Sequence, residues 1–332
     1  YINREVNASL SGGELKRIEI ATVLARGTKL SIFDEPEAGI DLWSFQNLIQ
    51  VFEKMRNAIH DSSILIISHQ ERILGIADVI VVIARDCGVL SDVIQKAHNA
   101  GIPVISYDRM INNADTDFYI SFDNRKVGEI MAQALVDALP QGGDIFMIQG
   151  PLSDNNVHML KEGFDDTLED TNLNVVYEAN CDGWTAELAV GYMEEALEKY
   201  PHVKGIMCGN DDIASQVVQV LAENQLAGNV MVVGQDGDLA ACQRIVEGTQ
   251  YMTAFKSIED LAKEAAKYVV EIGSGKEASE LEGVTEKAND GTYDIPARVL
   301  EPTAVTRENI DEVIIDGGFH RRDEGYLNAE YN

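Results

Sequence analysis

Short apolar segments alternate with amphipathic segments along most of this chain of 332 residues. The apolar segments have the length of buried strands, and helix-length segments such as "GVLSDVIQKAHNAG" separate them. The strand candidates are "LSIFDE", "ILIISH", "VIVVIA", "PVISYD", "FYISFD", "DIFMIQG", "NVVYEA", "GIMCGND" and "VMVVGQD". Alternation of this kind predicts βαβ units, and so an α/β protein whose parallel sheets carry helices on both faces.

Several of these predicted strands end in Asp, Asn or His. In open parallel sheets, ligands bind beyond the carboxyl ends of the strands, so these polar residues are the first candidates for a site. Asp and Asn are also the residues that cap helix N-termini. Both readings stay open for each position.

Composition excludes some classes of partner. There are 56 acidic and 26 basic residues, and the resulting net charge of -30 repels nucleic acid and anionic membranes. No apolar run is long enough to span a bilayer, so we expect no membrane insertion. Cys87, Cys181, Cys208 and Cys242 form no C-x-x-C pair, so we expect no metal site, and nothing in the sequence calls for a cofactor.

Four segments near the start of the chain follow one another in a telling order: "LSGGE", "LSIFDEP", "AGID" and "ILIISH". In this order they resemble the ATP-binding-cassette (ABC) ATPases, most of all the ATPase subunit of iron–sulfur cluster assembly systems. The resemblance covers about residues 1–83. It implies a signature motif, a Walker B strand, a D-loop and a switch histidine. The matching residues are Ser11, Gly12, Gly13, Asp34, Glu35, Asp41 and His69.

The resemblance gives these residues roles toward a nucleotide. Ser11 and the neighbouring amides at a helix N-terminus would cradle a γ-phosphate. Asp34 would hold magnesium through water, and Glu35 would polarise the attacking water. His69 would contact the γ-phosphate. Each role depends on a nucleotide that another part of the ATPase must hold.

The loop that would hold that nucleotide is absent from the sequence. No G-x-x-x-x-G-K-[ST] pattern occurs, so no nest of amides and no lysine are available for the β- and γ-phosphates. We therefore expect no enzyme activity, with Glu35 and His69 as inactive remnants. Two alternatives stay open for this segment: it supplies signature and Walker B elements in trans, or it supplies only helices and strands.

A second resemblance begins near Ala77 and runs to about His320. Its anchors are "YDRMIN", "ISFDN", "DNN", "DGW", "GND" and "GQDGDLA". They resemble the periplasmic sugar-binding proteins of the ribose/xylose type, D-xylose-binding proteins most of all. The resemblance implies a two-lobed type I periplasmic-binding-protein fold that holds D-xylose or a related aldopentose between its lobes. It also implies ABC importer membrane subunits as partners and a periplasmic or extracellular location, although the sequence as written carries no secretory signal.

A pyranose offers hydroxyls around its rim and two apolar faces, so its site needs carboxylates, amides, an arginine and a flat aromatic surface. By the resemblance, Asp108 and Arg109 contact sugar hydroxyls, and the arginine fork fits two oxygens at once. Trp184 would stack on the ring. The remaining contacts implied are Asn155 or Asn156, Asn210, Asp236 and Lys256.

These residues also have ordinary structural readings. Trp184 is equally suited to covering a core, and Asp108 to pairing with Arg109. Asp236 is placed to cap the segment "DLAACQRIVEG". What favours a site is that the residues follow strands in both implied lobes.

The two resemblances divide the chain into segments. Residues 1–83 would be the ABC ATPase fragment and would complete the N-terminal lobe. The rest of that lobe would be 84–123 and 257–295, and the C-terminal sugar-binding lobe would be 124–256. Residues 296–332 would form the third crossing and a tail. We expect the crossings between lobes near 121–124, 253–256 and 295–302.

The ATPase-like segment stands where such binding proteins have their own first strands, so we interpret the chain as a chimera joined within 76–85. To close the first lobe's sheet, "LSIFDE" or "ILIISH" must pair directly with "VIVVI". Losing two or three sugar contacts from the replaced strands would weaken binding roughly a hundredfold. Three functions remain: a weakened sugar-binding module, an ATPase fragment acting in trans, and a fold chimera with no ligand.

Overall fold

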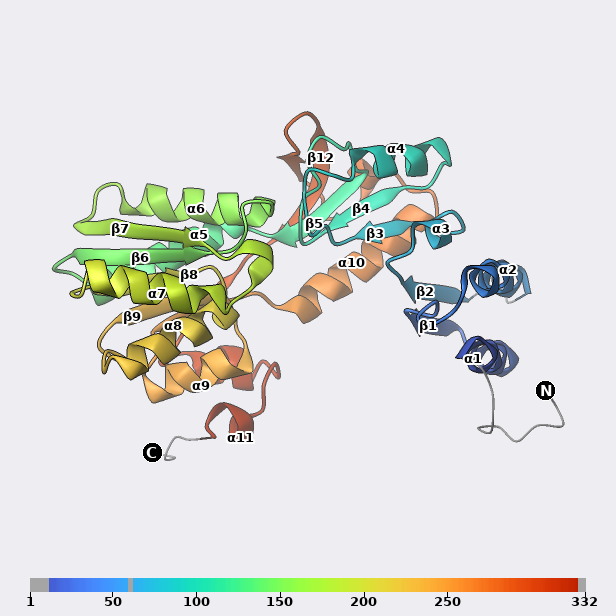
Figure 1. Ribbon diagram of the computed structural model, residues 1–332. Helices are drawn as coiled ribbons and strands as arrows, with labels where there is room; N and C mark the ends of the chain where they lie inside the picture. Colours follow the sequence, from blue (N-terminus) through green and yellow to red (C-terminus); the bar gives the residue numbers. More distant parts are fainter. Residues whose placement is uncertain (1–11, 59–61, 328–332) are drawn as a thin grey trace. The chain divides into compact units, whose positions relative to one another are not determined.

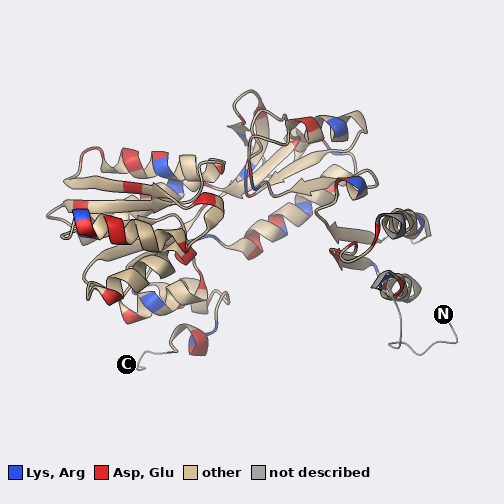
Figure 2. Ribbon diagram, viewed as in Figure 1, with Lys and Arg blue, Asp and Glu red and all other residues tan. Residues whose placement is uncertain are grey.

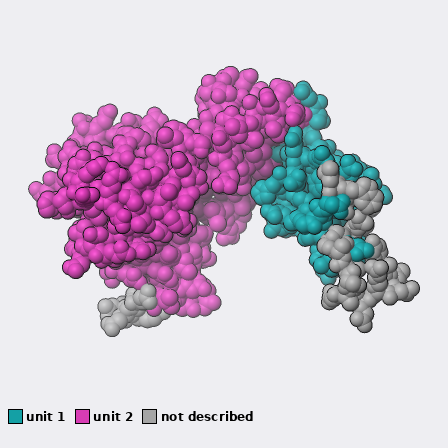
Figure 3. All heavy atoms as spheres, viewed as in Figure 1, with its two compact units in different colours: residues 1–80, 99–102 teal, residues 81–98, 103–332 magenta. Residues whose placement is uncertain are grey.

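A computed structural model describes residues 12–58 and 62–327. The chain divides into two compact units (Figure 3). Unit 1 comprises residues 1–80 and 99–102, and unit 2 comprises residues 81–98 and 103–332. Each unit is described by itself.

Unit 1 contains a two-stranded parallel sheet and its helices. Strand β1 (Leu30–Asp34) pairs with β2 (Ser63–Ile67) along its whole length, with Leu30 opposite Ser63 and Asp34 opposite Ile67. Helix α1 (Gly12–Arg26) precedes β1, α2 (Leu42–Ala58) connects the strands, and α3 (Glu71–Leu74) follows β2. This is the right order for a single βαβ unit.

One face of this small sheet is packed and the other is exposed. On the packed face, Phe33 meets Phe52 edge to face, with ring centroids 5.0 Å apart. On the opposite face, four apolar side chains of β1 and β2 are between 47% and 58% exposed: Leu30, Ile32, Leu65 and Ile67. The alternation along β1 is therefore that of a strand covered on one side only.

The strand pairing expected at the join is wrong for the described residues. Neither β1 nor β2 pairs with β3 (Ile80–Val82); they pair with each other, and β3 pairs with β4 (Val104–Tyr107). The physical reason lies in length. The three-residue β3 offers few ladder hydrogen bonds on its free edge, whereas β1 and β2 satisfy each other over five positions.

Unit 2 contains two lobes, each built on its own sheet (Figure 1). The larger sheet has the order β13-β10-β9-β8-β6-β7, parallel except for the antiparallel edge strand β13. Its strands are β6 (Gly143–Gln149), β7 (Leu173–Asn180), β8 (Gly205–Cys208), β9 (Met231–Asp236), β10 (Met252–Phe255) and β13 (Thr303–Thr306).

Helices cover both faces of this sheet. On one face, α5 (Asn124–Ala138) and α6 (Asn155–Leu168) pack on alternate residues of β6 such as Met147. On the other, α7 (Leu188–Lys199) and α8 (Asp211–Glu223) pack on the residues between them. Helix α9 (Leu239–Glu247) packs beside β10 together with the C-terminal segment. This arrangement is the predicted α/β architecture.

The smaller sheet has the order β11-β12-β5-β4-β3. Strands β5 (Phe118–Phe122) and β12 (Asp294–Leu300) form its centre, and β11 (Glu286–Asn289) is an antiparallel edge. Helix α4 (Ser91–Asn99) precedes β4, and α10 (Ile258–Gly273) packs on β5 through Tyr268 and Phe118. Short helices complete the two lobes and the C-terminal segment: η1 (Asp182–Trp184) follows β7 in the larger lobe, η2 (Ala278–Glu280) lies in the smaller one, and η3 (Asp311–Ile315) and α11 (Arg322–Gly325) lie in the C-terminal segment.

The chain passes between the two lobes three times. It leaves the smaller sheet after β5 and enters α5 at Asn124. It returns between β10 and α10, at Lys256 and Ser257, and passes once more between β12 and β13, at Glu301 and Pro302. Three such connections make a hinge between the lobes.

Helices α5 and α6 approach so closely that their backbones touch. A Cβ atom on Gly128 would lie 1.9 Å from the carbonyl oxygen of Leu160, and one on Gly163 would lie 2.0 Å from that of Arg125. Only glycine fits at either position, because both obstacles are backbone atoms. The first half of α5 is thus packed tightly against the middle of α6.

Charged side chains of both signs lie on the helices of both lobes. Acidic side chains are spread over the helices of both lobes with basic ones between them (Figure 2). None of the helices in the described part of the chain is both long and apolar enough to cross a membrane.

Candidate functional site

The predicted contact residues of unit 2 lie where strands end. Asp108 and Arg109 follow β4, and Asp236 is the last residue of β9. The remaining predicted contacts are Asn155 and Asn156 at the start of α6, Trp184 in η1 after β7, Asn210 between β8 and α8, and Lys256 after β10. Both lobes therefore contribute residues to this region.

Three contacts join the lobes across this region. Arg109 Nε lies 2.8 Å from Asp154 Oδ2, and Asn156 Nδ2 donates to the backbone oxygen of Asp108 at 3.2 Å. The Cys87 backbone N–H donates to the Ser153 carbonyl at 3.1 Å. The structure thus brings Asp108, Arg109 and Asn156 together, with the two lobes in contact.

Asp154 lies at the centre of this group, and the sequence reasoning did not select it. Its carboxylate caps α6 by accepting from the Asn156 N–H at 3.0 Å, and it accepts from the Trp184 indole Nε1 at 3.1 Å. The same carboxylate faces Arg109, and the side chain is only 1% exposed. The signal that was available is an Asp directly before a helical pattern in "SDNN".

Trp184 lies against bare backbone. A Cβ atom on Gly150 would be 2.3 Å from Cη2 of the indole, so only glycine allows the ring to lie where it does. Trp184 itself adopts a positive φ of 61°, a conformation that non-glycine residues rarely hold. Its partly buried ring is fixed by Gly150 on one side and by Asp154 at its N–H.

Lys256 and Asp236 form an ion pair beside Asp108. Lys256 Nζ lies 2.9 Å from Asp236 Oδ1, and the lysine side chain is 13% exposed. Burial lowers the pKa of Lys256, but Asp236 and Asp108 raise it by more, so the lysine stays charged. Burial raises the pKa of Asp108. The positive charges of Lys256 and Arg109 lower it, and the negative charges of Asp236 and Asp154 raise it further. Three carboxylates and two cations therefore interact in one place.

Two buried polar atoms in this group have no hydrogen-bond partner: Arg109 Nε and Asn156 Oδ1. The Arg109 Nε–Asp154 Oδ2 contact is short, but the N–H is poorly aligned with the oxygen, so it counts as an ion pair and not as a hydrogen bond. A buried donor and a buried acceptor left open in the same place are costly. Buried polar atoms of this kind normally find a partner in a protein group, an ordered water or a bound molecule.

One predicted contact, Asn210, makes a structural bond, whereas Asn155 lies at a helix start. Asn210 Oδ1 caps α8 by accepting from the Ile213 N–H at 2.9 Å, which leaves its amide group for other partners. Asn155 is the first residue of α6 and is partly buried. Asp236, by contrast, does not cap α9; the residue at that cap position is Asp238.

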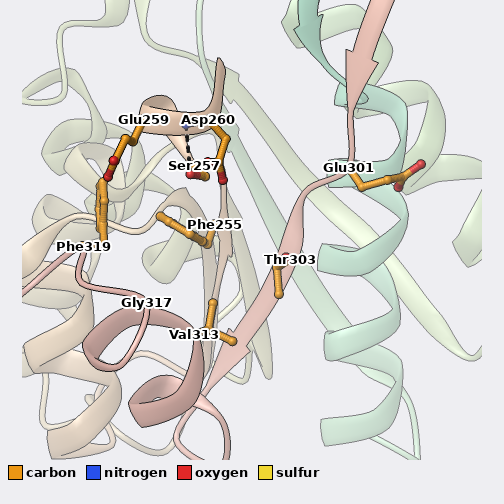
Figure 4. Close-up of a pocket in the computed structure, with 9 residues that line it drawn as sticks. All are labelled: Phe255, Ser257, Glu259, Asp260, Glu301, Thr303, Val313, Gly317 and Phe319. Atoms are coloured by element: carbon orange, nitrogen blue, oxygen red, sulfur yellow. Dashed lines mark hydrogen bonds between the residues drawn. The ribbon is translucent and has the colours of Figure 1, made fainter. Parts of the chain in front are cut away.

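A shallow groove of about 220 Å³ lies elsewhere in unit 2, beside the crossings between lobes. Phe255 sits in the middle of its lining residues, while the Glu301 side chain points away (Figure 4). Phe255 and Ser257 line the groove, whereas Lys256 between them pairs with Asp236. None of the predicted contact residues lines this groove.

The ATPase-like motif residues all fall in unit 1. Ser11 lies outside the described residues, and Gly12 and Gly13 begin α1. Asp34 ends β1, and Glu35 follows with a positive φ of 42°. Asp41 stands before α2, where its carbonyl accepts from the Phe45 N–H at 2.9 Å, and His69 follows β2.

Of this set, Glu35 and His69 come together. His69 Nε2 lies 3.1 Å from Glu35 Oε1, and both side chains are at least half exposed. The contact follows from the pairing of β1 with β2, because both residues come just after strands that lie side by side. The nearby Ser68 hydroxyl donates to Glu37.

All four cysteines are among the residues with described positions. No group of three or more His, Cys, Asp or Glu side chains there has the arrangement of a metal site. Cys87, Cys181, Cys208 and Cys242 are free thiols, and burial raises the pKa of each.

Comparison with known proteins decides the family. A sequence profile of the periplasmic binding protein domain matches residues 60–277. The chain belongs to the periplasmic binding protein family. The D-xylose-binding periplasmic protein of Escherichia coli (strain K12) is 42% identical over 252 residues, which cover 74% of this chain and 75% of that protein.

Solved structures agree on the fold of this periplasmic binding protein. An ABC transporter solute-binding protein from Clostridium phytofermentans, with bound β-D-glucose, superposes with a TM-score of 0.70. The match covers 89% of this chain and 99% of that chain at 24% sequence identity. The two-lobed α/β architecture with mostly parallel sheets is therefore that of known solute-binding proteins.

A second, shorter similarity points to another family. An uncharacterized ABC transporter ATP-binding protein of Methanocaldococcus jannaschii is 41% identical over 78 residues. This stretch covers 24% of the periplasmic binding protein described here and 30% of the archaeal protein.

Proposed function

We propose that unit 2 binds an aldopentose, D-xylose first among them, between its two lobes, as the solute-binding component of an ABC sugar importer. The observation that carries the proposal is the cluster across the lobes. It joins an indole ring, three carboxylates and two cations, with one buried donor and one buried acceptor still open. A small, uncharged molecule with several hydroxyls and an apolar face fits that combination.

Each residue has a defined task in this proposal. Asp108, Asp154 and Asp236 accept from sugar hydroxyls, and Arg109 donates to sugar oxygens. Lys256 pairs with Asp236 and is itself a donor. Trp184 offers its ring to the apolar face of the sugar. Asn155 or Asn156 and the amide of Asn210 supply the remaining polar contacts. No bond of the sugar is made or broken, so the function is binding.

The relatives support the choice of ligand. The Escherichia coli relative at 42% identity is a D-xylose-binding protein, and the identity extends over three quarters of its length. A closed pair of lobes is the form that a membrane transporter would recognise. Membrane subunits of an ABC importer are therefore the proposed protein partner.

We further propose that residues 1–83 derive from an ABC ATPase, so that the chain is a chimera. The 78-residue similarity to an archaeal ATP-binding protein and the Glu35–His69 contact both support this origin. They also favour a second candidate function for unit 1, the supply of Walker B and signature elements in trans. The first function draws on unit 2 and the second on unit 1.

Isothermal titration calorimetry of the whole chain tests the proposal. D-xylose, D-ribose and L-arabinose are titrated in turn, and ATP with magnesium in a fourth run. The expected result is saturable binding of D-xylose, tighter than either other pentose. The absence of binding by all three pentoses would refute the proposed function, and tight ATP binding would show that unit 1 holds a nucleotide without a phosphate-binding loop.

A further inference from the structure

The turn after β9 has an unusual backbone. Asp236 has a φ of 107° and Gly237 a φ of 79°, both in the left-handed region. A non-glycine residue keeps such a conformation only where its surroundings enforce it. The side chain of Asp236 departs from this turn toward Lys256. Whatever enforces the turn therefore also directs Asp236.

The carboxylate of Asp211 holds this turn. Its Oδ2 accepts from the backbone N–H groups of Gly237 at 3.0 Å and Asp238 at 3.1 Å, and from the Thr253 hydroxyl at 2.8 Å. Its Oδ1 accepts from Gln250 Nε2 at 2.8 Å. Asp211 is 1% exposed, so these four bonds replace the water it has lost.

The other side of the turn is held as well. His320 Nε2 donates to the Gly237 carbonyl at 2.8 Å, and the Gly237 N–H also approaches Thr253 Oγ1 at 3.2 Å. Gly237 is thus bonded at both its N–H and its C=O. These bonds hold the peptide groups on both sides of Gly237 in place.

Asp211 is itself fixed from behind by Arg244. Arg244 Nη2 donates to the backbone oxygen of Asp211 at 3.1 Å, Nη1 to Ser215 Oγ at 2.7 Å, and Nε to Gln250 Oε1 at 2.9 Å. Arg244 thus bonds only to the backbone of Asp211, and the carboxylate remains available to bond the turn. Burial, and next the charge of Asp236, raise the pKa of Asp211 to about 7.

Asp211 also lies where three strand ends meet. It directly follows Asn210 at the end of β8, bonds the turn that ends β9, and bonds Thr253 in β10, three residues before Lys256. The predicted contacts Asn210, Asp236 and Lys256 thus all lie a short distance along the chain from groups that Asp211 touches.

We propose that Asp211 is a positioning residue for the sugar site, which sets the turn at residues 236–238 and thereby aims Asp236 at the ligand. This inference rests on the proposed function of unit 2. Asp211 does not touch the sugar; it acts through Asp236 and through the Asp236–Lys256 pair.

The test compares two substitutions with two matched controls in the whole chain. Asp211→Asn keeps the shape but places N–H groups opposite N–H donors. Thr253→Val removes one donor to the carboxylate without changing the side-chain shape. The controls are Asp212→Asn, the exposed neighbour in the same helical turn, and Thr253→Ser, which restores the hydroxyl.

The measurement is D-xylose affinity by calorimetry, with thermal unfolding recorded for each variant. Asp211→Asn should weaken binding by about tenfold or more, and Thr253→Val by about threefold to tenfold. Asp212→Asn and Thr253→Ser should stay within about twofold of the parent. If Asp211→Asn does not fold, the Thr253 pair still decides the question.

A double-mutant cycle with Asp236→Asn separates positioning from general loosening of the fold. If Asp211 acts through Asp236, the double variant should bind D-xylose no more weakly than Asp236→Asn alone, while the losses in thermal stability add. Affinity losses that add as stability losses do would overturn the inference. If Asp211→Asn and Thr253→Val bind D-xylose as tightly as the parent, the inference is overturned and the proposed function stands. If the parent binds no pentose, both are overturned.

Discussion

The six-stranded sheet of unit 2 and the two-stranded sheet of unit 1 share parallel pairing but differ in how they are covered. On β6, the four consecutive side chains from Ile145 to Ile148 are fully buried, because helices pack on both faces. On β1 and β2, alternate apolar side chains remain about half exposed. Apolar strands in a sequence are therefore compatible both with a sheet covered on two faces and with a sheet covered on one.

The two units also show that recognisable motifs and a fully buried sheet need not occur together. Unit 1 carries a dense set of recognisable motif residues on a sheet with one bare face. In unit 2, the residues at strand ends form a connected cluster of polar groups. A parallel sheet gains most of its stability when both faces are buried. Specific motifs in unit 1 thus do not imply an independently stable fold.

Core truncations should give the largest contrast between the units. Phe146→Ala removes a fully buried ring that packs edge to face on Tyr177 and Tyr200, and should cost about 4 kcal/mol of unfolding free energy. The matched Phe33→Ala in unit 1 should leave the main unfolding transition in place. Chemical denaturation followed by circular dichroism measures both, and an equal shift of the main transition would break the comparison.

Sugar affinity should divide in the same way. Trp184→Ala removes the aromatic surface held by Gly150 and Asp154 and should cost about 2 kcal/mol of D-xylose binding free energy. Glu35→Ala, in the exposed Glu35–His69 pair, should cost under about 0.5 kcal/mol. Calorimetric titration of both variants checks this. Loss of binding in Glu35→Ala with none in Trp184→Ala would place the site in the other unit.

A smaller, pH-dependent effect is expected at Asp290, in the turn between β11 and β12. Its carboxylate accepts four backbone N–H bonds, from Ala114, Asp115, Thr292 and Tyr293, at 2.7 to 3.0 Å. Burial raises the pKa of Asp290, but these bonds lower it by more. A lowered pKa in the folded state means that the stabilisation is complete above the ordinary carboxyl range and is lost as pH falls through the folded value.

Asp290→Asn should therefore cost about 2 kcal/mol at pH 7, and its difference from the parent should shrink below about pH 4. The exposed Asp34→Asn in unit 1 serves as the control and should change stability by less than about 0.5 kcal/mol at either pH. Thermal unfolding from pH 7 to pH 3 measures both variants. A constant penalty for Asp290→Asn across this range would contradict the linkage.

The smallest effect is expected for nucleotide chemistry. With no phosphate-binding loop in the sequence, the chain should release no phosphate from MgATP above the buffer rate. Glu35→Gln should therefore behave as the parent does. Phosphate release that depends on Glu35 would show that unit 1 hydrolyses ATP without a phosphate-binding loop.

The sequence predicted the fold of unit 2 because its signals are local. Each buried strand is a short apolar run, each helix an amphipathic one, and their alternation alone gives a parallel α/β sheet. The pairing of β1 with β2 could not be read in this way. Both strands are apolar enough to join either sheet, so their own residues do not specify which partner they take.

The site divides along similar lines. Asp108, Asp236 and Lys256 follow strands and belong to motifs, so sequence reasoning selected them. Asp154 and Asp211 escaped it because each also reads as an ordinary residue at a helix start. Their importance lies in bonds to Trp184 and Gly237, each more than twenty residues away, which no local pattern reports.

The close approach of α5 and α6 at Gly128 and at Gly163 has a mechanical consequence. Helix α5 starts where the chain first crosses between the lobes, and the N-terminus of α6 carries Asp154 and Asn156. Backbone meets backbone at Leu160 and Gly163, in the middle of α6, so a rotation of α5 at that crossing should also move α6. Replacing either glycine by alanine would force the helices apart and shift the end of α6 that carries Asp154 and Asn156. Sugar affinity would then change although no residue of the site is altered.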